Sequence, residues 1–253
     1  MAEKKFLVDP KKRFSSRVEN YIKYRPSYPS EIIYFLKEKK ILAVDTVIAD
    51  IGSGTGILTK LFLDNGNQVY GVEPNKDMRE AAEKNLQGYT NFSSFEGSAE
   101  STGLEDKFID LIIAGQAFHW FDVEEAKREF RRILKPNGNV ALIWNKRGKA
   151  GSGFDSSYEK FTLKYGTDYK EVRKNEGNVD RFYTYEKETF DNFQELDFTS
   201  FKGRILSASY IPLPDNPIFP KMIVELEDLF SKHQRNGIIR IEYDTEIYYG
   251  QLS

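Results

Sequence analysis

Cysteine is absent from the 253 residues, and histidine, tryptophan and methionine are scarce, with two, two and three copies. A chain without cysteine forms no disulfide and offers no thiolate to a metal ion. The histidines and acidic residues also show no spacing typical of metal ligands. We therefore expect no metal site.

Long apolar runs and an excess of one charge are also missing. No run approaches the roughly 20 residues that span a bilayer, and the charged start MAEKKFLVDPKKRF lacks the apolar stretch of a secretory signal. The 37 Lys and Arg nearly balance the 39 Asp and Glu, which leaves a net charge of −2. This balance does not favour binding to nucleic acid or to a membrane. We expect a cytoplasmic monomer or homodimer that acts on a small-molecule substrate.

Residues 30–145 alternate short apolar runs with amphipathic stretches. The stretches predict helices that begin at Ser30, near Ile57, near Asn75 and at Asp122. Strands that alternate with helices indicate a parallel, doubly wound sheet, in which ligands bind beyond the carboxyl ends of the strands. The apolar runs predict strands at 46–52, 68–73, 92–97, 108–115 and 139–145.

The pattern changes after residue 145. A glycine-rich hinge (146–153) precedes a predicted helix, one face of which carries Phe154, Tyr158, Phe161, Tyr165 and Tyr169. The predicted fold class is α/β: a Rossmann-like doubly wound sheet, mostly parallel with an antiparallel C-terminal strand, plus a helical cap insertion. Further along the chain, residues 170–195 show no clean hydrophobic period. Residues 204–211 are strand-like and residues 220–233 are helix-like. Residues 239–247 alternate between apolar and polar, like a half-buried antiparallel strand.

A glycine-rich loop, DIGSGTG (50–56), lies between the first predicted strand and the next helix. Glycines there allow tight turning and close approach of the backbone to a ligand. Glu73 ends the second strand, 21 positions after Gly52, where a carboxylate can accept both hydroxyls of a ribose. In the alternative interpretation, Glu73 is a solvated strand-end residue and Pro74 only starts a helix.

The spacing within the loop bears on the class of cofactor. The glycines follow GxGxG, whereas GxGxxG is typical of pyrophosphate binding. Asp50 would repel a phosphate, but its carboxylate can face the ammonium group of a methionine moiety. The loop therefore favours S-adenosylmethionine (SAM) over a dinucleotide such as NAD(P).

Five segments together resemble the class I SAM-dependent methyltransferases (methyltransferase type 11). They are ADIGSGTG (49–56), VYGVEP (69–74), GSAE (97–100), QAFHWFD (116–122) and LKPNG (134–138). The elements HWFD and YRPSYP (24–29) are similar to the narrower group that includes trans-aconitate methyltransferase-like enzymes. The resemblance implies a cofactor site made of Tyr24, Arg25, Asp50, Gly52, Ser53, Gly54, Glu73, Pro74, Ser98, Ala99 and Gln116.

The resemblance also implies what these residues do. The glycine loop would lie under the methionine part of SAM, Glu73 would hold the ribose, and Ser98 and Ala99 would lie at the adenine edge. Many relatives have Asp at the position of Ser98. The backbone carbonyl of Gln116 would accept from the SAM amino group.

Tyr24 and Arg25 would close over the methionine end of SAM. Arg25 would pair with its carboxylate, as arginine does in bidentate, charge-assisted contacts. The alternative is that Arg25 is a surface residue before Pro26.

The acceptor side is expected around His119 and Trp120, which follow the fourth strand. His119 is the candidate general base or orienting donor, and the alternative is a packing role beside Trp120. Tyr210, with Ser207 and Ser209, lines either the acceptor pocket or the interior of a buried strand.

The aromatic face at 154–169 is either core or an apolar lid over the acceptor. Arg173 and Arg181 are further candidates there, because an aromatic wall with one or two cations suits an acceptor bearing a carboxylate or phenolate. We expect methyl transfer from SAM to a small molecule, giving S-adenosylhomocysteine (SAH). The alternatives are a non-catalytic SAM-binding protein and an NAD(P)-dependent oxidoreductase.

A single domain is predicted for residues 1–253. Its parts would be an N-terminal lid (1–29), a SAM-binding core (30–149), an acceptor-cap insertion (150–200) and a completion of the sheet (201–253).

Overall fold

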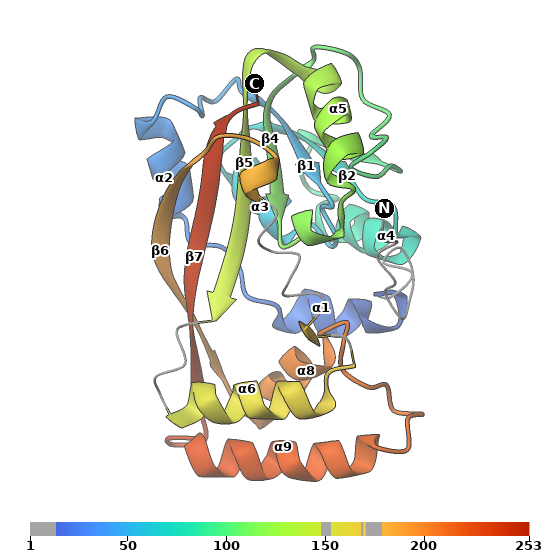
Figure 1. The fold of residues 1–253 in the computed structure, drawn as a ribbon, viewed down its shortest axis with the longest axis vertical. Helices are drawn as coiled ribbons and strands as arrows, with labels where there is room; N and C mark the ends of the chain where they lie inside the picture. The colour runs from blue at the N-terminus through green and yellow to red at the C-terminus, as the bar shows by residue number, and fades with distance from the viewer. Residues whose placement is uncertain (1–13, 148–152, 168, 171–178, 253) are drawn as a thin grey trace.

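One sheet organises the molecule, with the strand order β3-β2-β1-β4-β5-β7-β6 (Figure 1). The computed structural model describes residues 14–147, 153–167, 169–170 and 179–252. Strands β1 to β5 pair in parallel, whereas β7 is antiparallel to both β5 and β6. This confirms the predicted mostly parallel sheet with an antiparallel C-terminal strand. The strands are β1 (Val47–Ile51), β2 (Gln68–Val72), β3 (Phe92–Phe95), β4 (Ile109–Gly115), β5 (Leu134–Arg147), β6 (Glu186–Leu196) and β7 (Ile239–Gln251).

Both faces of the central strands are buried, which explains their nearly unbroken apolar sequences. In β5, Leu142 and Trp144 pack in one apolar core with Phe130 of α5 (Val123–Ile133). The alternate residue Ile143 packs in a second core with Phe62 of α3 (Ile57–Asp64) and with Leu36 of α2 (Glu31–Glu38). Helices on both faces make the sheet doubly wound.

All four predicted helix starts are confirmed, and two of them are capped by a side chain. Asn75 accepts from the Met78 N–H ahead of α4 (Lys76–Asn85), and Asp122 accepts from the N–H groups of Glu124 and Glu125 ahead of α5. Gly66, with φ 93°, follows the end of α3, where a left-handed residue suits glycine.

Residues 204–211 are not a strand, and that prediction is wrong. Residues Phe198–Leu206 form helix α8, whose start is capped by Asp197 accepting from the Ser200 N–H. The apolar residues Phe201 and Ile205 are four positions apart and both are buried, which is helical spacing.

Strand β6 lies within the segment 170–195, for which the sequence showed no clean period. It is an edge strand, and its residues are mostly exposed or half-buried, so no apolar face marks it.

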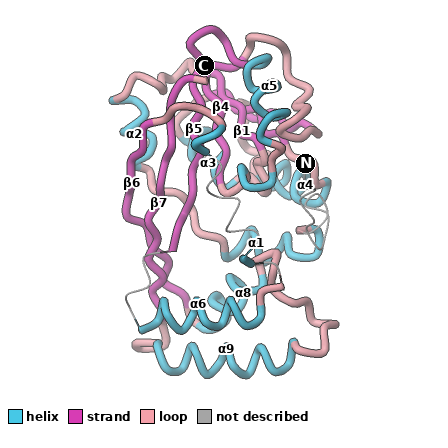
Figure 2. Tube along the Cα trace, viewed as in Figure 1, coloured by secondary structure: helices cyan, strands magenta, loops and turns pink. Residues whose placement is uncertain are grey.

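Three helices form a separate layer below the sheet: α6 (Gly153–Tyr165), α8 and α9 (Phe219–His233) (Figures 1 and 2). We name them the helical layer. Its core joins Tyr158, Phe161 and Tyr165 of α6 to Phe201 of α8 and Leu226 of α9. The aromatic face of α6 is therefore core. Within the described residues, no helix is long and apolar enough to cross a membrane.

The N-terminal segment lies between the sheet and the helical layer (Figure 1). It contains a 3-10 turn (Ser15–Arg17) and helix α1 (Val18–Tyr24). Arg17 Nη1 donates to the Leu206 carbonyl at 2.8 Å, and Gln194 Nε2 donates to the Tyr24 carbonyl at 3.1 Å. The segment is thus tied to the helical layer and to β6.

Candidate active site

The glycine loop turns the chain from β1 into α3 through left-handed backbone conformations. Gly52, Gly54 and Gly56 have φ values of 71°, 57° and 83°. A Cβ atom on Gly52 would lie 2.7 Å from the Cβ of Ala117, so a side chain there is excluded by contact as well as by backbone angle. The loop therefore presents bare backbone at the carboxyl end of β1.

Asp50 is buried at the start of this loop, with 1% of its surface exposed. Its Oδ2 accepts from the Thr59 hydroxyl at 2.6 Å, while Oδ1 has no hydrogen-bond partner. Burial raises the pKa of Asp50 to about 7; the Thr59 hydrogen bond opposes this shift and the charge of Glu73 adds to it. A cationic group placed beside Oδ1 would stabilise the ionised form.

Glu73 follows β2 and is also buried. Its two carboxylate oxygens accept from the Gly54 N–H at 2.9 Å and the Asn75 N–H at 2.8 Å. A carboxylate offers about four acceptor positions, so each oxygen keeps one for a further donor such as a ribose hydroxyl. Pro74 is half-buried between Glu73 and the cap of α4.

The predicted adenine edge forms a tight turn beyond β3. Ser98 and Ser101 exchange backbone hydrogen bonds of 3.0 and 3.1 Å, and the Ala99 side chain is buried. No described contact joins Ser98 or Ala99 to the glycine loop.

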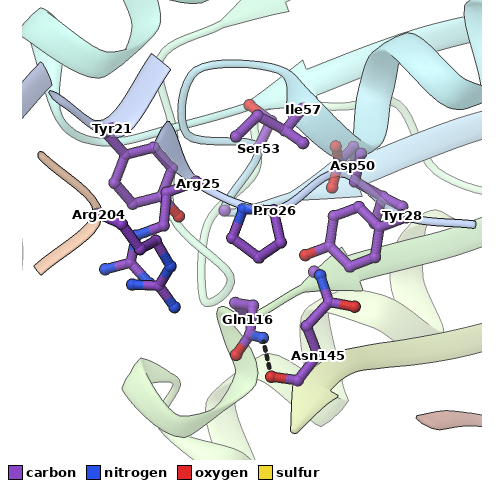
Figure 3. A pocket seen from close by; sticks show the side chains of 13 residues that line it. Tyr21, Arg25, Pro26, Tyr28, Asp50, Ser53, Ile57, Gln116, Asn145 and Arg204 are labelled. Carbon is purple, nitrogen blue, oxygen red and sulfur yellow. Dashed lines mark hydrogen bonds between the residues drawn. The ribbon is translucent and has the colours of Figure 1, made fainter. Parts of the chain in front are cut away.

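A cavity opens beside the loop, and we name it the inner cavity (Figure 3). Gln116 contributes to its wall from the end of β4, with a φ of 55° that is unusual for a residue other than glycine. The Gln116 side chain donates to the Asn145 carbonyl at 3.1 Å, which joins the ends of β4 and β5 (Figure 3). The lining residues labelled in the figure are Tyr21, Arg25, Pro26, Tyr28, Asp50, Ser53, Ile57, Gln116, Asn145 and Arg204.

A second cavity of about 130 Å³ adjoins the first, and we name it the outer chamber. His119, Trp120 and Tyr210, the three residues predicted for the acceptor, all line it. His119 is buried, and its ring centroid lies 4.5 Å from that of Trp120. The residues common to both cavities are Tyr21, Arg25, Gln116, Asn145 and Arg204.

The outer chamber is rich in cations, and they differ in how they are paired. Lys146 pairs with Glu246 at 2.6 Å. Arg147 pairs with Glu159 at 2.9 Å and lies 4.0 Å from the centre of the Tyr158 ring. Arg25 and Arg204 have no carboxylate partner among the described residues. Arg25 Nη2 donates to the Ser207 carbonyl at 3.0 Å, and its guanidinium lies 4.8 Å from the centre of the Tyr21 ring.

The structure brings eight of the fourteen residues predicted from the sequence to the two cavities. Six line neither cavity: Tyr24, Gly54, Glu73, Pro74, Ser98 and Ala99. Asp50, Gly52, Ser53, Arg25 and Gln116 share the inner cavity. The Tyr24 ring instead packs on Gly203 of α8, where a Cβ atom would lie 2.1 Å from Tyr24 Cδ2, and Tyr24 is not among the lining residues.

Arg181 and Arg173 are the two further cations predicted for the acceptor side, and the structure describes only the first of them. Arg181 is exposed and lines neither the inner cavity nor the outer chamber. Arg173 lies outside the described residues.

Sequence reasoning missed several lining residues, among them Asn145, Tyr21, Tyr28, Arg147 and Arg204. Asn145 ends a predicted strand, so its position at the carboxyl edge of the sheet was a usable signal. Tyr28 also had a signal as part of the YRPSYP motif, and Arg147 ends the strand that contains Asn145. Tyr21 and Arg204 carried none, because they reach the site through packing of distant segments.

Comparison with known proteins places these features in a family. Residues 49–142 match the family model described as "Methyltransferase domain". An uncharacterized methyltransferase of Schizosaccharomyces pombe is 36% identical over 135 residues, which cover 53% of each chain. A malonyl-[acyl-carrier protein] O-methyltransferase of Halalkalibacterium halodurans is 36% identical over 115 residues, 42% of each chain. The chain thus spans about half the length of the curated relatives it matches.

The fold has solved counterparts over nearly its whole length. A structure from Anaeromyxobacter dehalogenans, assigned as a type II methyltransferase, has a TM-score of 0.69 at 18% identity and covers 90% of this chain and 98% of its own. Another, from Anabaena variabilis and assigned as a methyltransferase of an antibiotic biosynthesis pathway, has a TM-score of 0.57 at 20% identity, with the same coverage. The family model, the relatives and the strand order together support a class I SAM-dependent methyltransferase, with the matched methyltransferase domain at residues 49–142.

Proposed function

We propose that this protein transfers a methyl group from SAM, held along the glycine loop and the inner cavity, to a small molecule in the outer chamber. The observation that carries the proposal is that the two cavities meet at Arg25, Gln116 and Asn145. A cofactor on the strand ends and an acceptor beside His119 would thus touch at one boundary.

The residues present fit SAM. The left-handed glycines leave room for a ligand along the backbone, and Asp50 Oδ1 is a buried acceptor without a partner. Asp50 suits the ammonium group, Arg25 the carboxylate, and the Gln116 carbonyl a further N–H of the amino acid part. Glu73 suits the ribose hydroxyls. SAM supplies an electrophilic methyl group on a sulfonium centre.

The protein's own contribution is positioning and exclusion of water. Arg25 and Asp50 would fix the methionine part from opposite sides, and the N-terminal segment would cover it. Holding two reactants in line accounts for much of the rate of such displacements. His119 would orient the acceptor or take its proton, and an acceptor that is already a carboxylate or phenolate needs no base.

Nothing in the geometry favours a nicotinamide cofactor, and a carboxylate at Asp50 would repel a pyrophosphate. A protein that binds SAM without turning it over would differ only in activity. Conversion of SAM to SAH in the presence of a small-molecule acceptor library distinguishes the two.

Glu73→Ala tests the cofactor site. This change removes a charged acceptor of two hydroxyl bonds, each worth roughly 1.5–3 kcal/mol. We expect calorimetry to show at least a tenfold loss of affinity for SAH. Glu83→Ala, an exposed carboxylate on α4, is the matched control and should leave the affinity unchanged. An unaltered dissociation constant in Glu73→Ala would refute the ribose assignment.

A further inference from the structure

Arg204 is a buried cation whose hydrogen-bonding capacity is largely unused. It lies in the last turn of α8 with 7% of its surface exposed, and it lines both the inner cavity and the outer chamber. Its Nε and Nη1 have no hydrogen-bond partner. Figure 3 shows its guanidinium beside that of Arg25, on the side of the inner cavity away from Asp50.

No acidic side chain in the described part of the chain neutralises Arg204. Its charged and titratable neighbours are Arg25 and the hydroxyls of Tyr158, Tyr210 and Tyr243. Arginine stays protonated in proteins, and tyrosine hydroxyls are neutral near pH 7. The other two cations of the outer chamber, Lys146 and Arg147, each have a glutamate partner. Arg204 is thus set apart by both its burial and its lack of an anion.

Arg25 and Arg204 also repel each other. Burial, and next the charge of Arg204, lower the pKa of Arg25. A buried guanidinium is normally retained only when it is paired, because its desolvation is costly. Two of them facing one space therefore indicate that anionic ligands complete the site. The carboxylate of SAM accounts for one, at Arg25, which leaves Arg204 for another.

We propose that Arg204 binds an anionic group of the methyl acceptor, so that the substrate class is a small organic carboxylic acid. The proposal rests on the proposed function. Arg204 belongs to the helical layer, whereas His119 and Trp120 follow β4 of the sheet, and all three line the outer chamber. The acid would thus be held between the two layers, and Arg204 would be a specificity-determining residue that contacts it directly.

Binding of defined acids tests this without knowledge of the natural acceptor. The probes are succinate and benzoate, each titrated against its neutral amide, succinamide or benzamide. Titrations are done by calorimetry on the full chain, both with saturating SAH and without it. We expect at least one acid to bind at least tenfold more tightly than its amide. Arg204→Gln should remove that preference, and Arg204→Lys should retain part of it.

Arg240→Gln is the control, because Arg240 is a half-exposed arginine on β7 that lines neither cavity. Arg240→Gln should leave the dissociation constants of the acids, the amides and SAH unchanged. Thermal unfolding and far-UV circular dichroism check that Arg204→Gln is folded; Arg204→Lys serves as the test variant if it is not, and should then weaken acid binding at least threefold.

The outcomes separate the two proposals. Failure of the wild type to bind SAH would refute the proposed function, and the titrations without SAH would still report on Arg204. Equal binding of acids and amides would overturn the role of Arg204. A loss of SAH affinity in Arg204→Gln as large as the loss of acid binding would also overturn it, since Arg204 would then belong to the cofactor carboxylate.

Discussion

At the scale of single residues, the site is built from buried charges that the protein alone does not fully satisfy. Asp50 keeps one oxygen without a partner, and Arg25 and Arg204 keep nitrogens without partners. Each such group costs stability in the ligand-free protein and gains a partner when a ligand of opposite charge arrives. The same residues therefore link ligand binding to pH and to stability.

Asp50 predicts a pH dependence of stability. Its pKa of about 7 in the folded protein lies above the ordinary value of 3.8. The protonated carboxyl therefore contributes fully to the free energy of unfolding below pH 4, and this contribution is lost as the pH rises through 7. Between pH 5.5 and 8 the ligand-free wild type should lose about 2 kcal/mol relative to Asp50→Asn, measured by urea unfolding. The exposed Asp45→Asn is the control. Parallel pH profiles for wild type and Asp50→Asn would show that Asp50 is not the group responsible.

SAM should bind more tightly at higher pH, since its ammonium group stabilises the ionised carboxylate of Asp50. We expect the affinity of the wild type for SAM to rise roughly tenfold per pH unit up to about pH 7 and then level off. Asp50→Asn should bind more weakly, with a flatter pH profile.

His119 is the residue whose role depends most on the acceptor. Once an acceptor is known, His119→Ala should lower the turnover rate, by roughly 10²–10⁴-fold if the imidazole is a general base. The affinity for SAH should stay within about threefold, because His119 lines the outer chamber and not the inner cavity. If SAH binding is lost as well, or turnover is untouched, then His119 only packs against Trp120.

At the scale of elements, the N-terminal segment is joined to the helical layer by the contact of Tyr24 with Gly203. The ring lies so close to α8 that only glycine fits beneath it. Arg17 and Arg25 add hydrogen bonds to carbonyls at the end of α8. The segment that would cover the cofactor is therefore held by the layer that would bind the acceptor.

Gly203→Ala should weaken the contact between the N-terminal segment and helix α8. Alanine favours a helix interior by up to about 1 kcal/mol over glycine, so a net loss of stability would measure the clash with Tyr24. We expect a lower melting temperature and weaker SAH binding, because Arg25 follows Tyr24 directly. Gly88→Ala, where a Cβ would meet nothing within 4 Å, is the control. The double variant Gly203→Ala with Tyr24→Ala should recover stability, and no loss in Gly203→Ala would show that the contact is easily relieved.

The elements also show why sequence reasoning reached only part of the structure. The buried strands and capped helices of residues 30–145 have local signals: apolar runs, Asn75, Asp122 and Gly66. The run 204–211 alone resembles a strand, because the Asp197 cap that marks helix α8 lies seven residues before it. Strand β6 has no apolar face of its own and is specified by pairing with β7. Arg204 reaches the site only through the packing of α8 under α1, so no local pattern marks it.

At the scale of the whole molecule, the two cavities lie where the sheet and the helical layer meet. The sheet supplies the glycine loop, Gln116 and His119, and the helical layer supplies Arg204, with Tyr210 just beyond α8. The segments that resemble the family contribute to both cavities: the glycine loop lines the inner cavity, and His119 and Trp120 line the outer chamber. The outer chamber also takes residues after 145, namely Lys146, Arg147, Arg204 and Tyr210, which lie outside the 49–142 match to the family model.

Strand β7 has a consequence for how the protein is made. It lies between β5 and β6 and pairs with both. Its residues Ile239 and Ile241 pack in the core of the helical layer, and Ile247 and Tyr249 pack in the core between the sheet and helices α2 and α3. A ribosome synthesises β5 and β6 well before β7. During that interval the edge of β5 is open and β6 has no neighbour, and exposed edges invite association between nascent chains. The part of the sheet from β1 to β4 can begin to fold during translation, but the core of the helical layer has to wait for β7 to leave the exit tunnel.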